Sequence, residues 1–534
     1  MSNCHNRAKS RLTNARHLIA FSALSFSLAL SGCMVGPKYR PPAAQAPATY
    51  KEAPANAPQQ NNQPARAQTP AGDPTAAGLG NWNPANPQDS RMKGKWWEIY
   101  NDAELNSLED QLNANNQNIR ISFENLMAAR AIVRQAHAQF FPVVGATPSW
   151  NRSRSSANLR NTTGGNAAFT GTTTTLIDLP GDASWQPDLW GKIRNTVRQA
   201  QYNAQLSAAD LENERLTEQS SLAIYFFELR GQDALQQILT ATVASYQKSL
   251  ELARAQYETG LTDQIATVQA QTTLQSAQSQ LTNVGIARAQ YEHAIATLIG
   301  KAASEFTMPA RPSIITPPAI PVGVPSQLLE RRPDVAAAER AMAASNAQIG
   351  IATAAFFPNL TLSASGGFES STWSNLLKWP SRFWSIGPSI SQTIFDAGLR
   401  RATVNQYVAV YNANLAAYRQ TTLNAFQQVE DALSGLRILT QQIQQQNQAV
   451  QFAKQALELE ISRYQLGIDP YINVVVQQNT LLSAQQTLAQ IEIQRTTASV
   501  QLIEALGGGW DRSQLPSTQT VTMKPASADT KQQH

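Results

Sequence analysis

The sequence predicts a mainly α-helical protein with a β-barrel part, in which one structural unit occurs twice. Three observations predict this fold: motifs that recur at a nearly constant spacing, heptad seams too long for a globular domain, and a strand-like stretch in each half of the chain. The expected unit consists of a helix, a short β-hairpin, a very long helix and a return helix.

Composition favours long helices over a compact enzyme. The chain has 534 residues, of which 15% are charged, and its middle is rich in Ala, Gln and Leu. Four of the 42 Lys and Arg residues precede an expected cleavage site, which leaves 38 basic against 37 acidic residues. This balance gives no reason to expect a nucleic-acid partner.

The first 33 residues have the layout of a bacterial export signal. A basic start is followed by an apolar run at 18–30, which is too short to span a bilayer, and by Leu30-Ser31-Gly32-Cys33. The small residues before a cysteine resemble a lipobox, so we expect cleavage after residue 32 and acylation of Cys33. A plain signal peptide with an incidental cysteine is the alternative. With Cys4 removed, the mature chain has one cysteine and no internal disulfide.

A long segment after the lipidation site lacks the apolar residues that folding needs. Between residues 40 and 87 the chain consists mainly of Pro, Ala, Gln and Asn. We expect residues 33–94 to form an extended strap tied to the membrane by its lipid.

The rest of the chain repeats itself. Ala-Gln-Phe-Phe-Pro at 138–142 recurs as Ala-Ala-Phe-Phe-Pro at 354–358, an offset of 216 residues. Tyr-Glu-Thr-Gly at 257–260 recurs as Tyr-Gln-Leu-Gly at 464–467, an offset of 207 residues. The nine lost residues fall between the Phe-Phe-Pro motif and the next long helix, where a loop tip absorbs them.

Turn and strand signals divide each repeat. Proline ends the helix before each hairpin, because it disfavours helical geometry in the preceding residue. Segments rich in Ser, Thr and Gly then carry the strand signal. The expected elements are a first repeat at 95–310 (hairpin 143–186, long helix 192–258, return helix 263–299), a second repeat at 311–512 (hairpin 359–395, long helix 399–466, return helix 470–506) and a disordered tail at 513–534.

The long helix of the second repeat has the strongest pattern in the sequence. Its seam alternates steps of four and three residues without a break, as a coiled coil requires. At ~1.5 Å per residue, the matching helix at 192–258 is about 100 Å long. The seam consists of Ala425, Val429, Ala432, Leu436, Leu439, Ile443, Gln446, Val450, Ala453, Leu457, Glu460 and Tyr464.

Strand counting predicts association. Two hairpins supply four strands, whereas the smallest transmembrane barrels need about eight and leave no edge unpaired in lipid. Three copies supply twelve strands. We therefore expect a trimeric 12-stranded outer-membrane β-barrel, continued on the periplasmic side by an α-helical coiled-coil barrel.

Enzymatic and metal-binding motifs are absent from the sequence. It contains no GxSxG, no phosphate-binding loop and no paired His motif, and the mature histidines (His137, His293 and His534) lie far apart. It has no Met, His or Cys cluster of the kind that binds metal ions. We therefore expect neither catalysis nor a cofactor.

Four motifs, in order, resemble one known family. They are Cys-Met-Val-Gly-Pro-Lys-Tyr at 33–39, Trp-Trp-Glu at 96–98, the stretch 328–367 with Arg-Arg-Pro-Asp-Val at 331–335, and Ala-Leu-Gly-Gly-Gly-Trp at 505–510. Together they resemble the outer-membrane efflux lipoproteins related to the TolC channel, over nearly the whole mature chain.

The resemblance implies a homotrimer in the cell outer membrane, whose helical tips meet a periplasmic adaptor linked to an inner-membrane pump. The duct would be passive, and we expect drugs or small organic compounds as its cargo. Type I protein secretion and metal efflux remain alternatives within this class. A trimeric coiled-coil surface or structural protein is the alternative from another class.

In relatives, helix turns equivalent to residues 257–267 and 464–476 close the tube at rest, often with acidic residues six or nine positions after the turn glycine. Here those positions hold other residues, so the resemblance predicts an aperture lined by apolar and amide groups, or one whose charge comes from nearer the turns. Ordinary solvated turn residues are the alternative. The aperture candidates are Asp263, Ala266, Arg463, Tyr464, Asp469, Asn473 and Val476.

Overall fold

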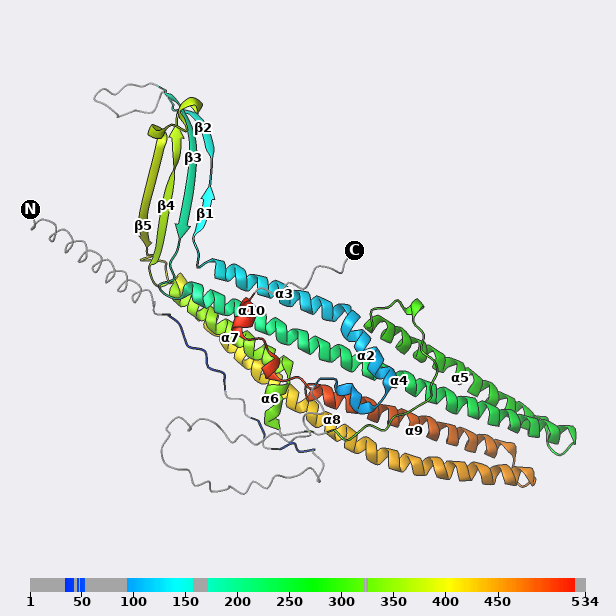
Figure 1. The fold of residues 1–534 in the computed structure, drawn as a ribbon. Helices are drawn as coiled ribbons and strands as arrows, with labels where there is room; N and C mark the ends of the chain where they lie inside the picture. The colour runs from blue at the N-terminus through cyan, green and yellow to red at the C-terminus, as the bar shows by residue number, and fades with distance from the viewer. Residues whose placement is uncertain are drawn as a thin grey trace, which may run out of the picture.

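The computed structural model describes residues 34–42, 46–47, 49–52, 94–156, 171–320, 322 and 325–523. The expected export signal and Cys33 lie outside the described residues, as does most of the expected strap. Figure 1 shows an elongated molecule, with the strands at one end and two long helical hairpins extending toward the other.

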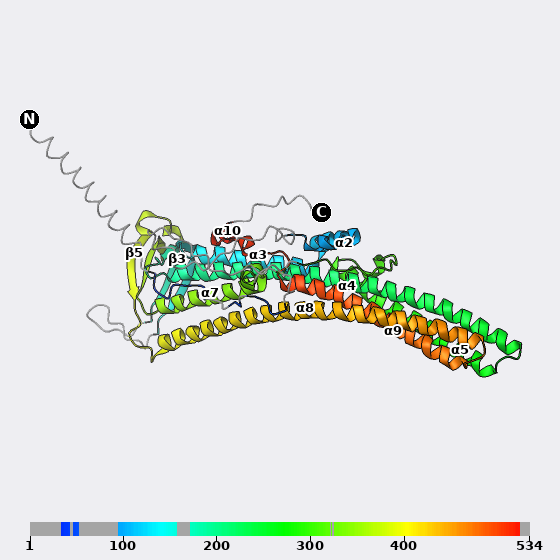
Figure 2. The same cartoon turned by 90° about the horizontal axis from the view of Figure 1, so that it is seen from below.

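Two hairpins of equal dimensions dominate the fold. Helix α4 (Lys192–Glu258) and helix α8 (Leu399–Gln465) each have 67 residues, and the return helices α5 (Gln264–Leu298) and α9 (Tyr471–Ala505) each have 35. Their ends lie within one residue of the ranges expected from the sequence. Figure 2 shows the four helices running side by side in a gently curved bundle. Within the described ranges, no helix combines the length and apolar character needed to cross a bilayer.

Shorter helices pack beside the long helices near the strands. Helices α3 (Gln117–Ala138) and α7 (Pro333–Ala354) each have 22 residues and occupy equivalent places in the two repeats. Both pack against α4. The remaining helical elements are η2 (Trp96–Tyr100), α2 (Ala103–Asn115), η3 (Ala303–Glu305), η4 (Pro325–Gln327), α6 (Leu328–Arg331), η5 (Trp373–Asn375), η6 (Trp379–Ser381), η7 (Arg512–Gln514) and α10 (Thr518–Thr522).

The strands form one antiparallel sheet built from both repeats. The hairpins join where β3 pairs with β4, so β5 lies at one edge of the sheet, while β1 and β2 lie one after the other along the opposite edge. The sheet is therefore four strand positions wide. Its strands are β1 (Val143–Ala146), β2 (Ser149–Arg154), β3 (Thr173–Trp185), β4 (Asn359–Ser370) and β5 (Arg382–Ser391).

Aromatic residues of the Phe-Phe-Pro motifs hold the junction between helices and strands. Trp185 Nε1 donates a hydrogen bond to Phe140 O (2.9 Å), and Trp190 Nε1 donates one to Pro358 O (2.8 Å). The Trp190 ring also stacks on Phe357, with 4.8 Å between ring centres. Each motif thus ends a helix and also supplies a partner for a tryptophan at the foot of the sheet.

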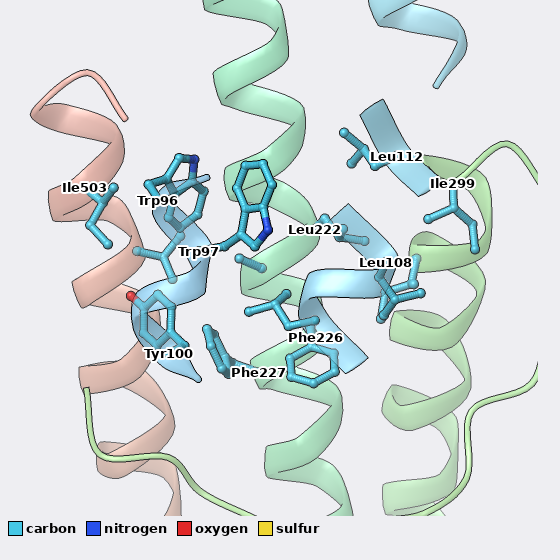
Figure 3. Packing of buried hydrophobic residues seen from close by; sticks show 14 of the residues in the cluster. Trp96, Trp97, Tyr100, Leu108, Leu112, Leu222, Phe226, Phe227, Ile299 and Ile503 are labelled. Atoms are coloured by element: carbon cyan, nitrogen blue, oxygen red, sulfur yellow. The ribbon is translucent and has the colours of Figure 1, made fainter. Parts of the chain in front are cut away.

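The largest apolar core of the described residues lies around the middle of α4, close to where α5 and α9 end. Figure 3 shows its packing. There η2 and α2 pack on α4, α5 and α9. Trp96 is completely buried, and the hydroxyls of Tyr100 and Ser499 are hydrogen bonded at 2.7 Å. This core fastens the chain segment before the first hairpin to helices from both repeats.

A buried ion network adjoins this core. The Arg230 side chain is 1% exposed and donates hydrogen bonds to Asp233 (2.9 Å), to Glu104 and to Pro309 O (2.8 Å). The fully buried Asp233 also accepts a hydrogen bond from Arg288 Nε at 2.7 Å. The network thus connects α4, α5, α2 and the segment that leads into the second repeat.

The described part of the strap contacts both repeats. Val35 N donates to Trp190 O (3.1 Å), and Asn195 donates to Val35 O (3.2 Å). In the second repeat, Asn346 donates to Pro37 O at 3.0 Å. The segment that directly follows Cys33 therefore lies at the foot of the sheet, between α4 and α7.

Part of the tail differs from the expectation of disorder at 513–534. Residues 513–523 pack on the helices, with Val521 completely buried against α3 and α4, whereas 524–534 lie outside the described residues. Arg130 donates to Thr520 O (3.0 Å), and Gln205 donates to Pro516 O (2.9 Å). Composition misled the prediction, because these partners stand more than 300 residues earlier in the chain and satisfy the backbone of a polar segment.

Candidate functional site

Both long hairpins turn through the same helix-ending motif. Gly260 and Gly467 adopt left-handed backbone conformations, with φ of +72° and +71°. The next amide reaches back into the helix: Leu261 N donates to Gln256 O at 2.8 Å, and Ile468 N donates to Arg463 O at 3.0 Å. This is a Schellman motif, which favours glycine because other residues are strained at such φ values.

The first tip uses its acidic residue as a helix cap. Asp263 accepts hydrogen bonds from Ile265 N (3.1 Å) and Ala266 N (3.4 Å) at the start of α5. Ala266 is 4% exposed and packs inside the tip. The structure thus places Ala266 away from solvent, which differs from its expected position at the aperture.

The second tip has an ion pair instead of a cap. Arg463 Nε donates a hydrogen bond to Asp469 Oδ2 across the turn, and this bond holds the pKa of Asp469 below its ordinary value. Pro470 occupies the N-cap position of α9 and makes no side-chain cap. The first tip has Gln256 at the position equivalent to Arg463, so it cannot form the same pair.

A buried cluster with residues from all four long helices joins the two hairpins just above the tips. Tyr464 and Tyr471 are 5% and 4% exposed, and their rings meet edge to face with centres 5.1 Å apart. Gln478 of α9 donates to Ser249 Oγ of α4 at 2.8 Å. Burial raises the pKa of Tyr471 to about 12, so its hydroxyl stays protonated at physiological pH.

The sequence analysis missed Tyr471, Gln478 and Ser249 as functional candidates. Tyr464 is the last residue of the heptad seam, which marks it in the sequence. The other three are marked only by their contacts across helices, which the sequence does not display. The structure brings Arg463, Tyr464 and Asp469 together. Burial raises the pKa of Tyr464, and the nearby Asp263 carboxylate raises it further.

The remaining candidates lie on the surface of α9. Asn473 is half-buried and Val476 is 51% exposed. Exposed apolar side chains surround the turns, with Leu261 at 77% and Leu466 at 75% exposure. The tips therefore present apolar groups and one ion pair instead of a row of carboxylates.

The sheet has one apolar face and one polar face. Residues directly opposite each other across strands point to the same side, and consecutive residues alternate. Asp178 stands opposite Glu369, on the face that carries mostly Ser, Thr and Asn. The other face carries Val144, Trp150, Ile177, Leu179, Leu360, Leu362, Phe368, Trp384, Ile386 and Ile390.

Comparison with known proteins identifies this combination of sheet and helical hairpins. A model of the family described as "Outer membrane efflux protein" matches residues 108–301 and 324–508, which together make up more than half of the chain. The chain belongs to this family. Its members are passive channels of the outer membrane, so the protein is an outer-membrane efflux channel and has no enzymatic activity.

Curated relatives match over nearly their whole length. The chain is 29% identical over 496 residues to the probable efflux pump outer membrane protein TtgC of Pseudomonas putida. This match covers 93% of this chain and 96% of that protein. It is 30% identical over 490 residues to the solvent efflux pump outer membrane protein SrpC of the same species, at 91% and 97% coverage. The cation efflux system protein CusC of Escherichia coli is 28% identical over 499 residues, at 91% and 98% coverage.

Solved structures show the same fold. The outer-membrane channel OprN superposes with a TM-score of 0.76 at 28% identity, covering 90% of this chain and all of that one. The CmeC outer membrane channel of Campylobacter jejuni superposes with a TM-score of 0.76 at 22% identity, covering 91% and 97%. The likeness to OprN and CmeC spans both the sheet and the helical hairpins.

Proposed function

We propose that three copies of the chain, each lipid-anchored at Cys33, close into a 12-stranded barrel continued by a helical tube. The single observation that carries this proposal is the sheet, which is four positions wide with an apolar and a polar face and free edges at β5 and at β1 and β2. Free edges cannot remain in hydrocarbon. Pairing β5 of one copy with the opposite edge of the next removes every edge when the ring closes.

The polarity of the two faces decides which of them points outward in that barrel. The apolar face carries exposed Trp150, Trp384 and Ile386 and would contact lipid, while the face with Asp178 and Glu369 would line a water-filled lumen. The helices would then hang on the periplasmic side. The strap supports this orientation, because the residues after Cys33 lie at the foot of the sheet, where an acyl chain would enter the inner leaflet.

The duct would receive its cargo from a periplasmic adaptor and an inner-membrane pump. Relatives are named for the efflux of antibiotics, toluene and solvents. One relative is named for cation efflux. In the part of the chain that the structure describes, no group of three His, Cys, Asp or Glu side chains could hold a metal ion. We therefore favour small organic compounds, ahead of metal ions or secreted proteins.

The two helix tips would form the resting closure. Arg463 and Asp469 hold the second turn, and the buried contact between Tyr464 and Tyr471 holds α8 against α9. The hydrogen bond from Gln478 to Ser249 joins that hairpin to α4. Asn473 and Val476 lie next to these groups along α9 and would border the aperture, whereas Asp263 acts as a helix cap.

Single-channel conductance combined with native mass spectrometry tests this proposal. Detergent-purified wild type should give a trimer and discrete current steps in a planar bilayer. Asp469→Ala and Arg463→Ala should each raise the open probability by about threefold or more, since three copies lose the same ion pair. Arg120→Ala is the matched control, because it breaks an exposed ion pair on α3 far from the tips. A monomer without conductance would refute the duct, and equal open probabilities would refute the tip closure.

The closure should be insensitive to pH over the physiological range. The pKa of Asp469 is lowered in the folded state, so its contribution is complete above the ordinary value of about 3.9 and disappears only as pH falls through the lowered value. Tyr471, with a pKa of about 12, stays neutral throughout. We expect a constant open probability between about pH 5 and pH 8 and opening in stronger acid. A midpoint inside that window would mean that other groups control the tips.

A further inference from the structure

Basic residues on the sheet are confined to its apolar face and to the end farthest from the helices (Figure 1). Arg154 stands opposite Thr173 and Arg152 opposite Thr175, at the last ladder positions of β2 and β3. Arg382 begins β5 and stands opposite Phe368. By the alternation of the strands, all three arginines share the face of Trp150 and Trp384.

Acidic residues are confined to the other face. Asp178, Asp182 and Glu369 share the polar face, where Asp178 stands directly opposite Glu369. Positive and negative side chains of the sheet are thus separated by the sheet itself. Solvation alone would not separate them, because arginines that only needed water would be expected on the polar face as well.

The loop between β4 and β5 adds a cation and exposed aromatic groups at the same end. Trp373 and Trp379 are 69% and 72% exposed, while Leu376 is buried and anchors the loop. The Arg382 guanidinium lies over the Trp379 ring, 3.6 Å from its centre. Lys378 Nζ donates to Asn375 Oδ1 at 2.8 Å. Tryptophan beside arginine or lysine is typical of a membrane–water interface.

These cations have no carboxylate partners in the sheet region that the structure describes. The salt bridges of the described residues lie in the helices, in the segments that flank or join them, in the strap and in the tips. We call Arg152, Arg154, Lys378, Arg382, Trp373 and Trp379 the basic–aromatic rim. The rim carries four positive charges per copy, and among the described residues none of the four forms a salt bridge.

We propose that the basic–aromatic rim binds the phosphate groups of anionic lipids in the outer leaflet. The proposal rests on the barrel proposed above, which would place the rim just outside the apolar band. Guanidinium groups bind phosphate oxygens through paired hydrogen bonds, and long side chains at the end of an apolar face extend their charge into the headgroup layer. The tryptophans would lie beside them at the same depth.

Native mass spectrometry of the delipidated channel, titrated with lipid A, tests the proposal. The probe is used in two forms, with both phosphates and fully dephosphorylated. The bisphosphorylated form should bind wild type in preference to the dephosphorylated form. The triple variant Arg152→Gln, Arg154→Gln and Arg382→Gln should weaken binding of the bisphosphorylated form by about tenfold or more. The triple Arg→Lys variant, which keeps the charge but loses the paired hydrogen bonds, should bind more tightly than the triple Gln variant and more weakly than wild type.

A matched control comes from the polar face. Asp178→Asn with Glu369→Gln changes the same end of the sheet but should leave lipid binding nearly unchanged. Equal binding of both lipid forms by wild type, or full affinity in the triple Gln variant, would overturn the proposal. Unitary conductance separates it from the duct: the triple Gln variant should still form trimeric channels, whereas a wild type without conductance would refute the barrel itself.

Discussion

Asp233→Ala should lower the free energy of unfolding by about 3–5 kcal/mol, because it removes the fully buried carboxylate that Arg230 and Arg288 share. Asp233 is fully buried and accepts hydrogen bonds from Arg230 and Arg288 at 2.9 and 2.7 Å. It also accepts one from Arg311 N at 2.9 Å. Denaturant or thermal unfolding of the purified protein, followed by circular dichroism, measures the change.

The control for this measurement is Asp431→Ala on the exposed side of α8. The exposed Asp431 carboxylate accepts a 3.3 Å hydrogen bond from Gln427 one turn away, so its loss should change stability by about 0.5 kcal/mol or less. If Asp233→Ala were equally mild, the network would be solvated in the assembled channel, and the link it makes between the two repeats would be weak.

Gly367→Ala should block assembly of the channel while leaving the helices folded. A Cβ atom at Gly367 would lie 2.1 Å from Leu179 O, a backbone atom of the neighbouring strand. The strain falls where β3 and β4 join the two repeats, and it would recur in every copy of the proposed trimer. Overpacking of this kind costs about 1–3 kcal/mol per site. Native mass spectrometry and conductance should show loss of trimer and current, with unchanged helical circular dichroism.

Gly387→Ala is the matched control on the next strand. A Cβ atom there has nothing within 4 Å, and Gly387 shares the polar face with Gly367. It should assemble like wild type. Wild-type assembly of Gly367→Ala would show that the β3–β4 junction opens by a few tenths of an ångström in the membrane, and that this glycine is not required by the close strand approach.

The helical part of this fold is readable from the sequence because its periodicity is local. Every seam residue named from the heptads, from Ala425 to Tyr464, is buried or half-buried in the structure. The long helices begin and end within one residue of their expected positions, since Gly191 and Gly398 precede them and Gly260 and Gly467 follow them. The strand stretches were also located, although Thr147 and Pro148 divide the first of them into β1 and β2.

The tips were less predictable because their contacts join distant segments. Ser249 and Gln478 are hydrogen bonded across 229 residues, and neither lies in a motif. Ala266 was expected at the aperture by position, yet the tertiary packing of α5 turns it inward. The ion pair of Arg463 and Asp469 spans six residues, so the sequence analysis could name both partners.

The order of synthesis gives the strap a further consequence. The strap leaves the ribosome early, yet Asn346, which binds Pro37, lies 309 residues later, and Glu430, which accepts hydrogen bonds from the amides of Lys51 and Glu52, follows after nearly 380 residues. The described part of the strap therefore cannot complete its contacts until the second repeat has been synthesised. A chain truncated before the second repeat would keep the strap contacts to Trp190 and Asn195 but lack those to Asn346 and Glu430, so we expect proteases to cut its strap faster than that of the full chain.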